Sequence, residues 1–135
     1  MLGKSFSHLK ALEKTLDAAW LRNEAVSNNI ANVNTPNYKR SDVEFEKMLK
    51  SSMSAYTIQG SVTHEKHMPI GVGTIDQIEP TVTTDFSTKY RKDGNNVNID
   101  VEMAELAKNT IRYNMLTQRL SGELRKLKMV IKDGR

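Results

Sequence analysis

Apolar side chains recur at alternating spacings of three and four residues near each end of this 135-residue chain. A heptad pattern of this kind keeps one stripe of a helix against a partner helix along its whole length. No Pro or Gly interrupts the first pattern between residues 4 and 35. The spacing therefore predicts a helix over 5–31. Its predicted seam consists of Leu9, Leu12, Leu16, Ala19, Asn23, Val26 and Ile30.

The second pattern predicts a helix over 100–132. Asp100 is a plausible N-cap, and the acidic Glu102 in the first turn suits the positive end of the helix dipole. Gly122 lies inside this helix and costs about 1 kcal/mol relative to Ala, so we interpret it as a close-packing site or a weak point. The predicted seam consists of Ile99, Met103, Leu106, Thr110, Tyr113, Thr117, Leu120, Leu124, Leu127 and Ile131.

One polar residue, Asn23, lies on the first seam. We expect one of two roles for it. It can fix the register of the helix pair, with Thr110 and Thr117 opposite, at some cost in stability. Alternatively, it lies at the edge of the seam and binds water.

The middle of the chain has no continuous helical period. The spacing of Ser41 and Glu44 matches a capping box, which predicts a short helix over 42–53. Asp93-Gly94-Asn95-Asn96 predicts a turn before the second long helix. The segments with β propensity are 61–63, 74–78 and 81–84.

These elements predict a mainly α protein in which long N- and C-terminal helices pack as a coiled-coil-like unit. A short helix and a small irregular or β-containing insert are expected between them. We therefore expect a discontinuous helical domain made of residues 1–33 plus 98–135, with the turn motif, the short helix and the insert in residues 34–97.

Counted with Gly and without Tyr, 40% of the residues are apolar, fewer than the about 45–50% of a typical soluble domain. We therefore expect burial against partner chains, or partial disorder of the chain alone. The net charge is +4, and most of the local excess of positive charge lies in the last eleven residues. This basic tail suits the negative end of a helix dipole. A helical adaptor or nucleic-acid-binding module that uses the tail is a minor alternative.

No constellation of catalytic residues stands out, and an enzyme is not expected. His64 and His67 are spaced by three residues in a segment without helical period, whereas a zincin helix needs a spacing of four. We therefore predict no metal site and no cofactor, and no small-molecule substrate. The first thirty residues contain no apolar stretch of the length that a secretory signal needs.

The stretch from Asn29 to Arg40 reads N-I-A-N-V-N-T-P-N-Y-K-R. It resembles the N-I-A-N-x-x-T-P-G-Y-K motif of the bacterial flagellar rod, hook and related axial proteins. The segments 93–100 and 102–107 are similar to those of the proximal rod members of this family. The family motif residues are Asn29, Ile30, Ala31, Asn32, Asn34, Thr35, Pro36 and Tyr38.

The resemblance implies a structural subunit of the flagellar basal-body rod, a hollow drive shaft that transmits torque and encloses the export channel. It implies assembly with further copies, with other rod proteins and with proteins at the junction of membrane ring and export gate. It also implies export by the flagellar type III apparatus without a cleaved signal, and a location in the cell envelope, periplasmic where there is an outer membrane. Another axial rod protein of the same superfamily is the alternative.

Asn37 departs from the family motif, which usually has Gly at this position. If the position requires a positive φ, Asn is the least costly replacement, because it enters the left-handed region more readily than other non-Gly residues. We also expect Asn29, Asn32 and Asn34 to tie the turn to the end of the helix by Asx-type hydrogen bonds.

Overall fold

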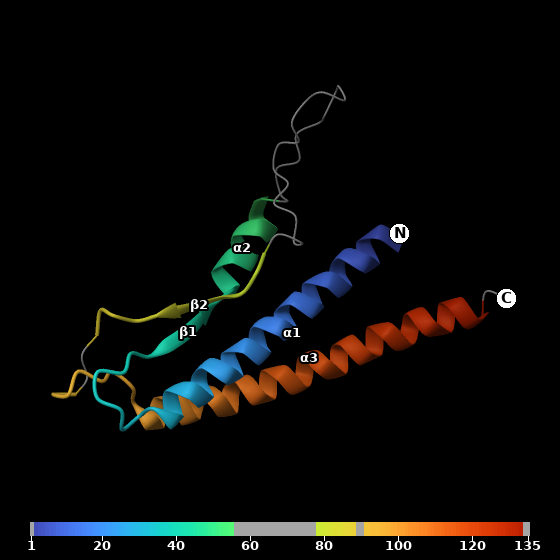
Figure 1. The fold of residues 1–135 in the computed structure, drawn as a ribbon. Helices are drawn as coiled ribbons and strands as arrows, with labels where there is room; N and C mark the ends of the chain where they lie inside the picture. The colour runs from blue at the N-terminus through green and yellow to red at the C-terminus, as the bar shows by residue number, and fades with distance from the viewer. Residues whose placement is uncertain (1, 56–77, 89–90, 134–135) are drawn as a thin grey trace.

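The computed structural model describes residues 2–55, 78–88 and 91–133. Two long helices dominate it: α1 spans Leu2–Ala31 and α3 spans Ile99–Asp133. They run antiparallel, lie against each other at the end where α1 stops and α3 starts, and separate towards the chain termini (Figure 1). The mainly α fold with two long terminal helices is confirmed.

Three short elements lie between the long helices: strand β1 (Ser41–Glu44), helix α2 (Glu46–Ala55) and strand β2 (Thr81–Thr84). The two strands pair antiparallel, with Ser41 opposite Thr84 and Glu44 opposite Thr81. This small sheet packs on the side of α1 (Figure 1). Together with α2 it forms an insert that is attached to the helix pair.

A small apolar core joins the insert to α1. Phe45, between β1 and α2, is 1% exposed and is the largest fully buried side chain among the described residues. It lies where the chain changes from strand to helix, and its carbonyl accepts the first hydrogen bond of α2, from the Leu49 N–H. The buried members of this core are Ala18, Ala25, Val43, Phe45 and Ile78.

The predicted capping box at Ser41 and Glu44 is wrong, because these residues form β1 and the helix predicted over 42–53 begins only at Glu46. The Ser41 N–H donates to the side-chain oxygen of Asn29 on α1 rather than starting a helix. The partner strand and the α1 side chain, both distant in sequence, here override a local helix signal.

The strand predicted at 81–84 is confirmed as β2. The segment 61–63 and most of 74–78 lie outside the described residues; Ile78 is described, is buried and belongs to no strand.

The predicted N-cap Asp100 is wrong. Asn98 caps α3 instead, because its side-chain oxygen accepts hydrogen bonds from the N–H groups of Asp100 and Val101, at 3.0 and 3.5 Å. The helix therefore starts one residue earlier than the sequence predicts.

Candidate functional site: a polar junction between the terminal helices

The turn after α1 and the turn before α3 are held together by one buried side chain. Asn95 is 0% exposed, and its amide nitrogen donates to the carbonyls of Asn32, Val33 and Thr35 at 3.1, 3.1 and 2.9 Å. Its amide oxygen accepts from the Val97 N–H at 2.7 Å. Asn95 thus ties the turn before α3 to three backbone carbonyls of the turn that follows α1.

The two turns also meet through their backbones. The Asn37 N–H donates to the Asp93 carbonyl at 3.0 Å. Asn37 has a φ of 60° and Gly94 a φ of 82°, so both lie in the left-handed region, as expected for Asn37 from its place in the motif. A Cβ at Gly94 would lie 2.6 Å from the side-chain oxygen of Asn37, so this close approach requires glycine.

A carboxylate from α3 is buried beside these turns. Glu102 is 0% exposed and accepts hydrogen bonds from the amide of Asn29 at 2.9 Å and from the guanidinium of Arg40. Asn29 is also fully buried and bonds both the N–H and the carbonyl of Ser41, at 2.9 and 2.8 Å. One network therefore connects α1, the start of β1 and α3.

The charge of Glu102 is balanced by Arg40. Burial lowers the pKa of the Arg40 guanidinium, but the hydrogen bond and the charge of Glu102 outweigh this and raise its pKa overall. A buried ion pair is tolerated only when both partners are present and hydrogen-bonded. We call Asn29, Arg40, Asn95, Asn96 and Glu102 the junction.

Asn96 completes the junction on the side of the insert. Its side-chain oxygen accepts from the Arg40 N–H at 2.6 Å, and its amide donates to the Asp85 carbonyl at 2.8 Å. The insert, the turn before α3 and the end of α1 are therefore fixed relative to one another.

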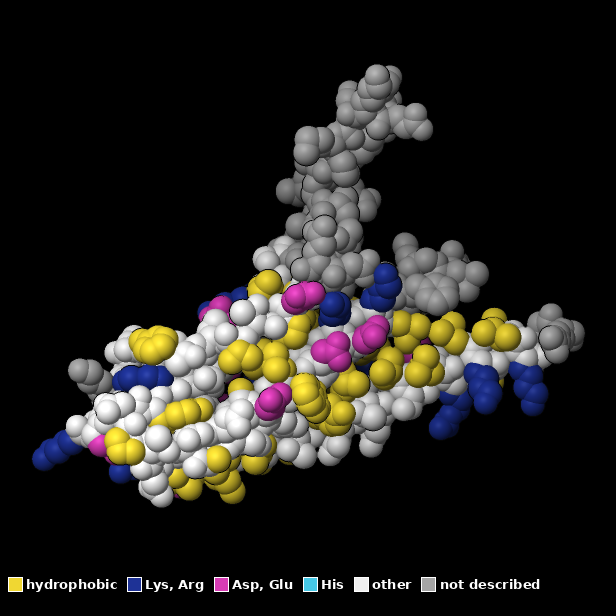
Figure 2. Space-filling view, viewed as in Figure 1, with side chains coloured by type: hydrophobic (Ala, Val, Ile, Leu, Met, Phe, Trp, Pro, Cys, Tyr) yellow, Lys and Arg dark blue, Asp and Glu magenta, His cyan; other side chains and the backbone are white. Residues whose placement is uncertain are grey.

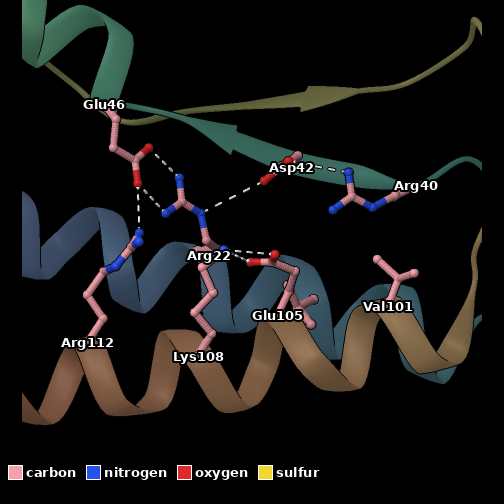
Figure 3. A pocket seen from close by; sticks show the side chains of 9 residues that line it. Arg22, Arg40, Asp42, Glu46, Val101, Glu105, Lys108 and Arg112 are labelled. Carbon is pink, nitrogen blue, oxygen red and sulfur yellow. Dashed lines mark hydrogen bonds and ion pairs between the residues drawn. The ribbon is translucent and has the colours of Figure 1, made fainter.

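A second polar cluster lies further along the helices. Arg22 on α1 binds both carboxylate oxygens of Glu46 at 2.6 Å and donates to the Val43 carbonyl at 2.8 Å. Arg112 on α3 reaches the same carboxylate at 3.0 Å, and both guanidinium groups point at Glu46 (Figure 3). The hydrogen bond from Arg22 is the main cause that lowers the pKa of Glu46 to about 2.

A groove of about 540 Å³ lies between this cluster and the junction. Its charged lining residues are mostly engaged with one another, as with Lys108 and Glu105 at 3.0 Å (Figure 3). Such mutually paired charges hold the elements in place rather than offering a free acid or base. The residues that line the groove are Arg22, Val26, Arg40, Asp42, Glu46, Val101, Glu105, Lys108 and Arg112.

On α1, all seven predicted seam residues are buried or half-buried, from Leu9 to Ile30. The predicted seam of α3 consists of two rows of residues, each with a spacing of seven. Only one of these rows lies on the face towards α1. This row is half-buried and consists of Leu106, Tyr113, Leu120 and Leu127. The exposed members of the predicted seam are Ile99, Met103, Thr110, Thr117, Leu124 and Ile131.

The row that completes the contact face of α3 is shifted by one residue. Its members are buried or half-buried and are Glu102, Asn109, Leu116 and Glu123. Three of these four are polar, so a search for apolar periodicity passes over them. Carboxylate and amide side chains that repeat every seven residues beside the apolar seam are a signal that leads to Glu102, and so to the junction.

Asn23 faces α3, where its side-chain oxygen accepts a hydrogen bond from the Asn109 amide at 2.8 Å. Asn109 also donates to the Ala19 carbonyl at 2.7 Å. The predicted partners Thr110 and Thr117 are wrong, because their hydroxyl groups bond carbonyls of their own helix. The contact between Asn23 and Asn109 favours the register-fixing role over the water-bound alternative.

The remaining motif residues surround the turn. Asn32 donates to the Asn28 carbonyl at 2.8 Å, and Thr35 donates to the side-chain oxygen of Asn32 at 3.2 Å. The Tyr38 hydroxyl donates to Asn29 at 3.4 Å. Ile30 is half-buried, and the exposed motif residues are Ala31, Asn34, Thr35 and Pro36.

His64 and His67 lie outside the described residues. Among the residues that the structure describes, no three His, Asp or Glu side chains gather as a metal site would require. None of the described helices combines the length and the apolar character needed to span a membrane.

Known proteins are similar to this chain over nearly its whole length. A model of the family described as flagella basal body rod protein matches residues 9–39, which cover most of α1 and the turn after it. The flagellar basal body rod protein FlgB of Bacillus subtilis (strain 168) is 33% identical over 127 residues, which are 94% of this chain and 95% of the relative. The chain belongs to the FlgB family of flagellar basal body rod proteins.

Two further FlgB proteins from other bacteria support the same assignment. FlgB of Aquifex aeolicus (strain VF5) is 31% identical over 127 residues, covering 94% of each chain. FlgB of Escherichia coli (strain K12) is 28% identical over 141 residues, covering 99% of each chain. The similarity to FlgB thus extends through the junction into α3.

Proposed function

We propose that this chain is a structural subunit of the proximal flagellar rod, where its terminal helices pack with those of neighbouring subunits. The assembled subunits form a hollow shaft that transmits torque and encloses the export channel. Membership of the FlgB family supports this role. The junction supports it too, because it fixes the direction in which the two long helices leave the insert.

The observation that carries the proposal is the surface of α3. A helix of a monomeric soluble protein rarely leaves so many large apolar side chains in water, and such surfaces mark interaction sites. Ile131 is 75% exposed, and Leu124 is 52% exposed. The exposed large hydrophobic residues of α3 are Ile99, Val101, Met103, Ile111, Met115, Leu124, Met129, Val130 and Ile131.

The same reasoning divides the chain into two functional parts. Residues 1–33 and 98–135 supply the axial unit that meets other subunits, and residues 34–97 supply the junction turn and the insert. The exposed predicted seam residues Met103, Leu124 and Ile131 then serve contacts between subunits, whereas the half-buried ones serve contacts within the subunit.

The partners proposed for this unit are further copies, other rod proteins and the proteins that lie where the membrane ring meets the export gate. Delivery by the flagellar type III apparatus takes the chain to the basal body in the cell envelope. The role is mechanical, so it involves no catalysis, no cofactor, no nucleic acid and no small-molecule substrate.

Incorporation into isolated basal bodies tests the proposal. A tagged wild-type chain should be recovered in them, and Leu124→Asp should abolish recovery because the exposed apolar surface is interrupted by a charge. Lys92→Asp, at an exposed position in the turn, is the matched control and should be incorporated. Normal recovery of Leu124→Asp, or absence of the wild-type chain from basal bodies, would contradict the proposal.

A further inference from the structure

A stripe of acidic residues with one tryptophan lies on the outer face of α1. It consists of Glu13, Asp17, Trp20 and Glu24, at spacings of four, three and four residues. All four side chains are exposed, and Trp20, the only tryptophan, is 59% exposed. Tryptophan at the centre of an exposed stripe is typical of a binding hot spot. We call this surface the acidic stripe.

A stripe with the opposite charge lies on the C-terminal part of α3. It consists of Ser121, Arg125, Lys128 and Lys132, again at spacings of four, three and four residues. All four are exposed. Lys and Arg side chains line one side of this end of α3 and hydrophobic side chains line the other (Figure 2). We call this surface the basic stripe.

The charged side chains of the two stripes lack the ion pairs that the central arginine side chains make. Arg22, Arg40 and Arg112 all form ion pairs within the subunit. No ion pair joins the three carboxylates of the acidic stripe, or the three cations of the basic stripe, to another residue that the structure describes. Each stripe therefore presents charge that the subunit itself does not balance.

We propose that the acidic stripe of one copy binds the basic stripe of a second copy, with the two helices antiparallel. This inference rests on the proposed function. In the antiparallel register, Arg125 lies over Trp20, and a guanidinium stacks well on an indole ring. The same register pairs Glu13 with Lys132 and Asp17 with Lys128. Ser121 and the adjacent Gly122 then face Glu24.

The occupant is a second copy because one chain carries both surfaces and cannot bring them together. On each helix the stripe lies about a quarter turn or more round from the residues that face the other helix, such as Asn23 and Asn109, which are joined by a hydrogen bond of 2.8 Å. Binding of two different surfaces in this way is heterologous, and it continues from subunit to subunit instead of closing into a dimer. Gly122, where an added Cβ would meet nothing within 4 Å, leaves room for a second helix to approach.

Cysteine trapping tests the register, and the chain contains no natural Cys that would interfere. Two tagged copies, one carrying Glu13→Cys and the other Lys132→Cys, are expressed together, and basal bodies are isolated and oxidised. We expect a disulfide-linked pair of the two copies. Glu13→Cys with Thr83→Cys, an exposed position on β2, is the control and should give no such pair.

The outcomes separate this inference from the proposed function. Both copies recovered in basal bodies without a disulfide would overturn the inference while the rod role stands. A bond between Lys132→Cys and Glu24→Cys, in place of Glu13→Cys, would overturn the antiparallel register. A bond from Glu13→Cys to a different protein would overturn the assignment of the partner.

Exchange of charges provides an independent test. Asp17→Lys and Lys128→Asp should each reduce incorporation into basal bodies, because each places like charges opposite one another. The two substitutions together should restore incorporation, since they recreate the pair with its charges reversed. Loss without restoration in the double variant would overturn the inference, because a purely structural role of either residue would not be rescued.

Discussion

The two ends of the α1–α3 pair differ in which side chains are buried and which are exposed. At the junction, polar groups are buried and satisfied, as with Glu102 and Asn95, both 0% exposed. Towards the C-terminus of α3, apolar side chains are exposed to solvent, as with Val130 at 68% and Ile131 at 75%. The junction therefore fixes the geometry of the subunit, whereas the distal end of α3 carries an exposed apolar surface of the kind that marks interaction sites.

The largest effect is expected at the junction. Glu102→Ala should destabilise the free chain by about 3–5 kcal/mol, because it leaves Arg40 and Asn29 without their buried partner. Glu105→Ala, one turn later, removes a carboxylate that pairs with exposed Lys108 and should cost less than about 1 kcal/mol. Urea unfolding followed by circular dichroism measures both. Equal losses would mean that the junction does not concentrate stability.

Replacement of glycine by alanine should destabilise the chain at one position and stabilise it at another. Gly94→Ala should cost about 1–3 kcal/mol, because its φ is 82° and its Cβ would meet Asn37. Gly122→Ala should stabilise the free chain by about 1 kcal/mol, because nothing lies near that position in the helix. Thermal unfolding of the two variants decides. Destabilisation by Gly122→Ala would show that the subunit itself requires this glycine.

The ion pairs of Glu46 predict that the stability of the chain depends on pH in the acidic range. The pKa of Glu46 falls from 4.5 to about 2 on folding, so its ion pair stabilises the chain fully above pH 4.5 and is lost as the pH falls to about 2. Because the Glu46 side chain is 56% exposed, solvent screening limits this contribution to roughly 1 kcal/mol.

Glu46→Gln measures this contribution. The variant should be less stable than the wild-type chain at pH 7, and the difference should vanish near pH 2. Urea unfolding at a series of pH values gives the difference. A difference that stays constant over this range would mean that the Glu46 carboxylate is not the titrating group.

The smallest effect is expected at the distal end of α3. Ile131→Ser should change the stability of the free chain by less than about 0.5 kcal/mol, because the side chain is already in water. Leu12→Ala, on the same pair of helices but only 8% exposed, should cost about 2–5 kcal/mol. Similar losses for both, measured in the same unfolding experiment, would mean that the distal ends are packed in the free subunit.

Sequence periodicity was sufficient for the long helices because their pattern extends over many turns, and the predicted and observed bounds differ by at most three residues. It failed at Ser41 and Glu44, where partners distant in sequence decide between strand and helix. The positive φ of Asn37 could be anticipated from the motif, since few residues adopt that conformation at low cost.

The junction was less accessible to sequence reasoning. The sequence pattern explains Glu102 as a residue that suits the helix dipole, and Asn95 as part of a turn. Each reading explains the residue locally, so nothing in the local pattern required burial. Their roles depend on partners about 60 residues away along the chain. The Asn95 amide donates to the Thr35 carbonyl, and the Glu102 carboxylate accepts from the Arg40 guanidinium.

The pairing of β1 with β2 has a consequence for changes of length in the insert. Because Glu44 lies opposite Thr81, the chain leaves the ladder and returns to it at the same point. Residues 45–80 are therefore an excursion whose two ends are already joined by the strands. Insertions or deletions between Ala55 and Ile78 can change the bulk of the insert without altering the angle at which the long helices leave the junction. The ladder thus fixes the positions at which the chain leaves and re-enters the sheet.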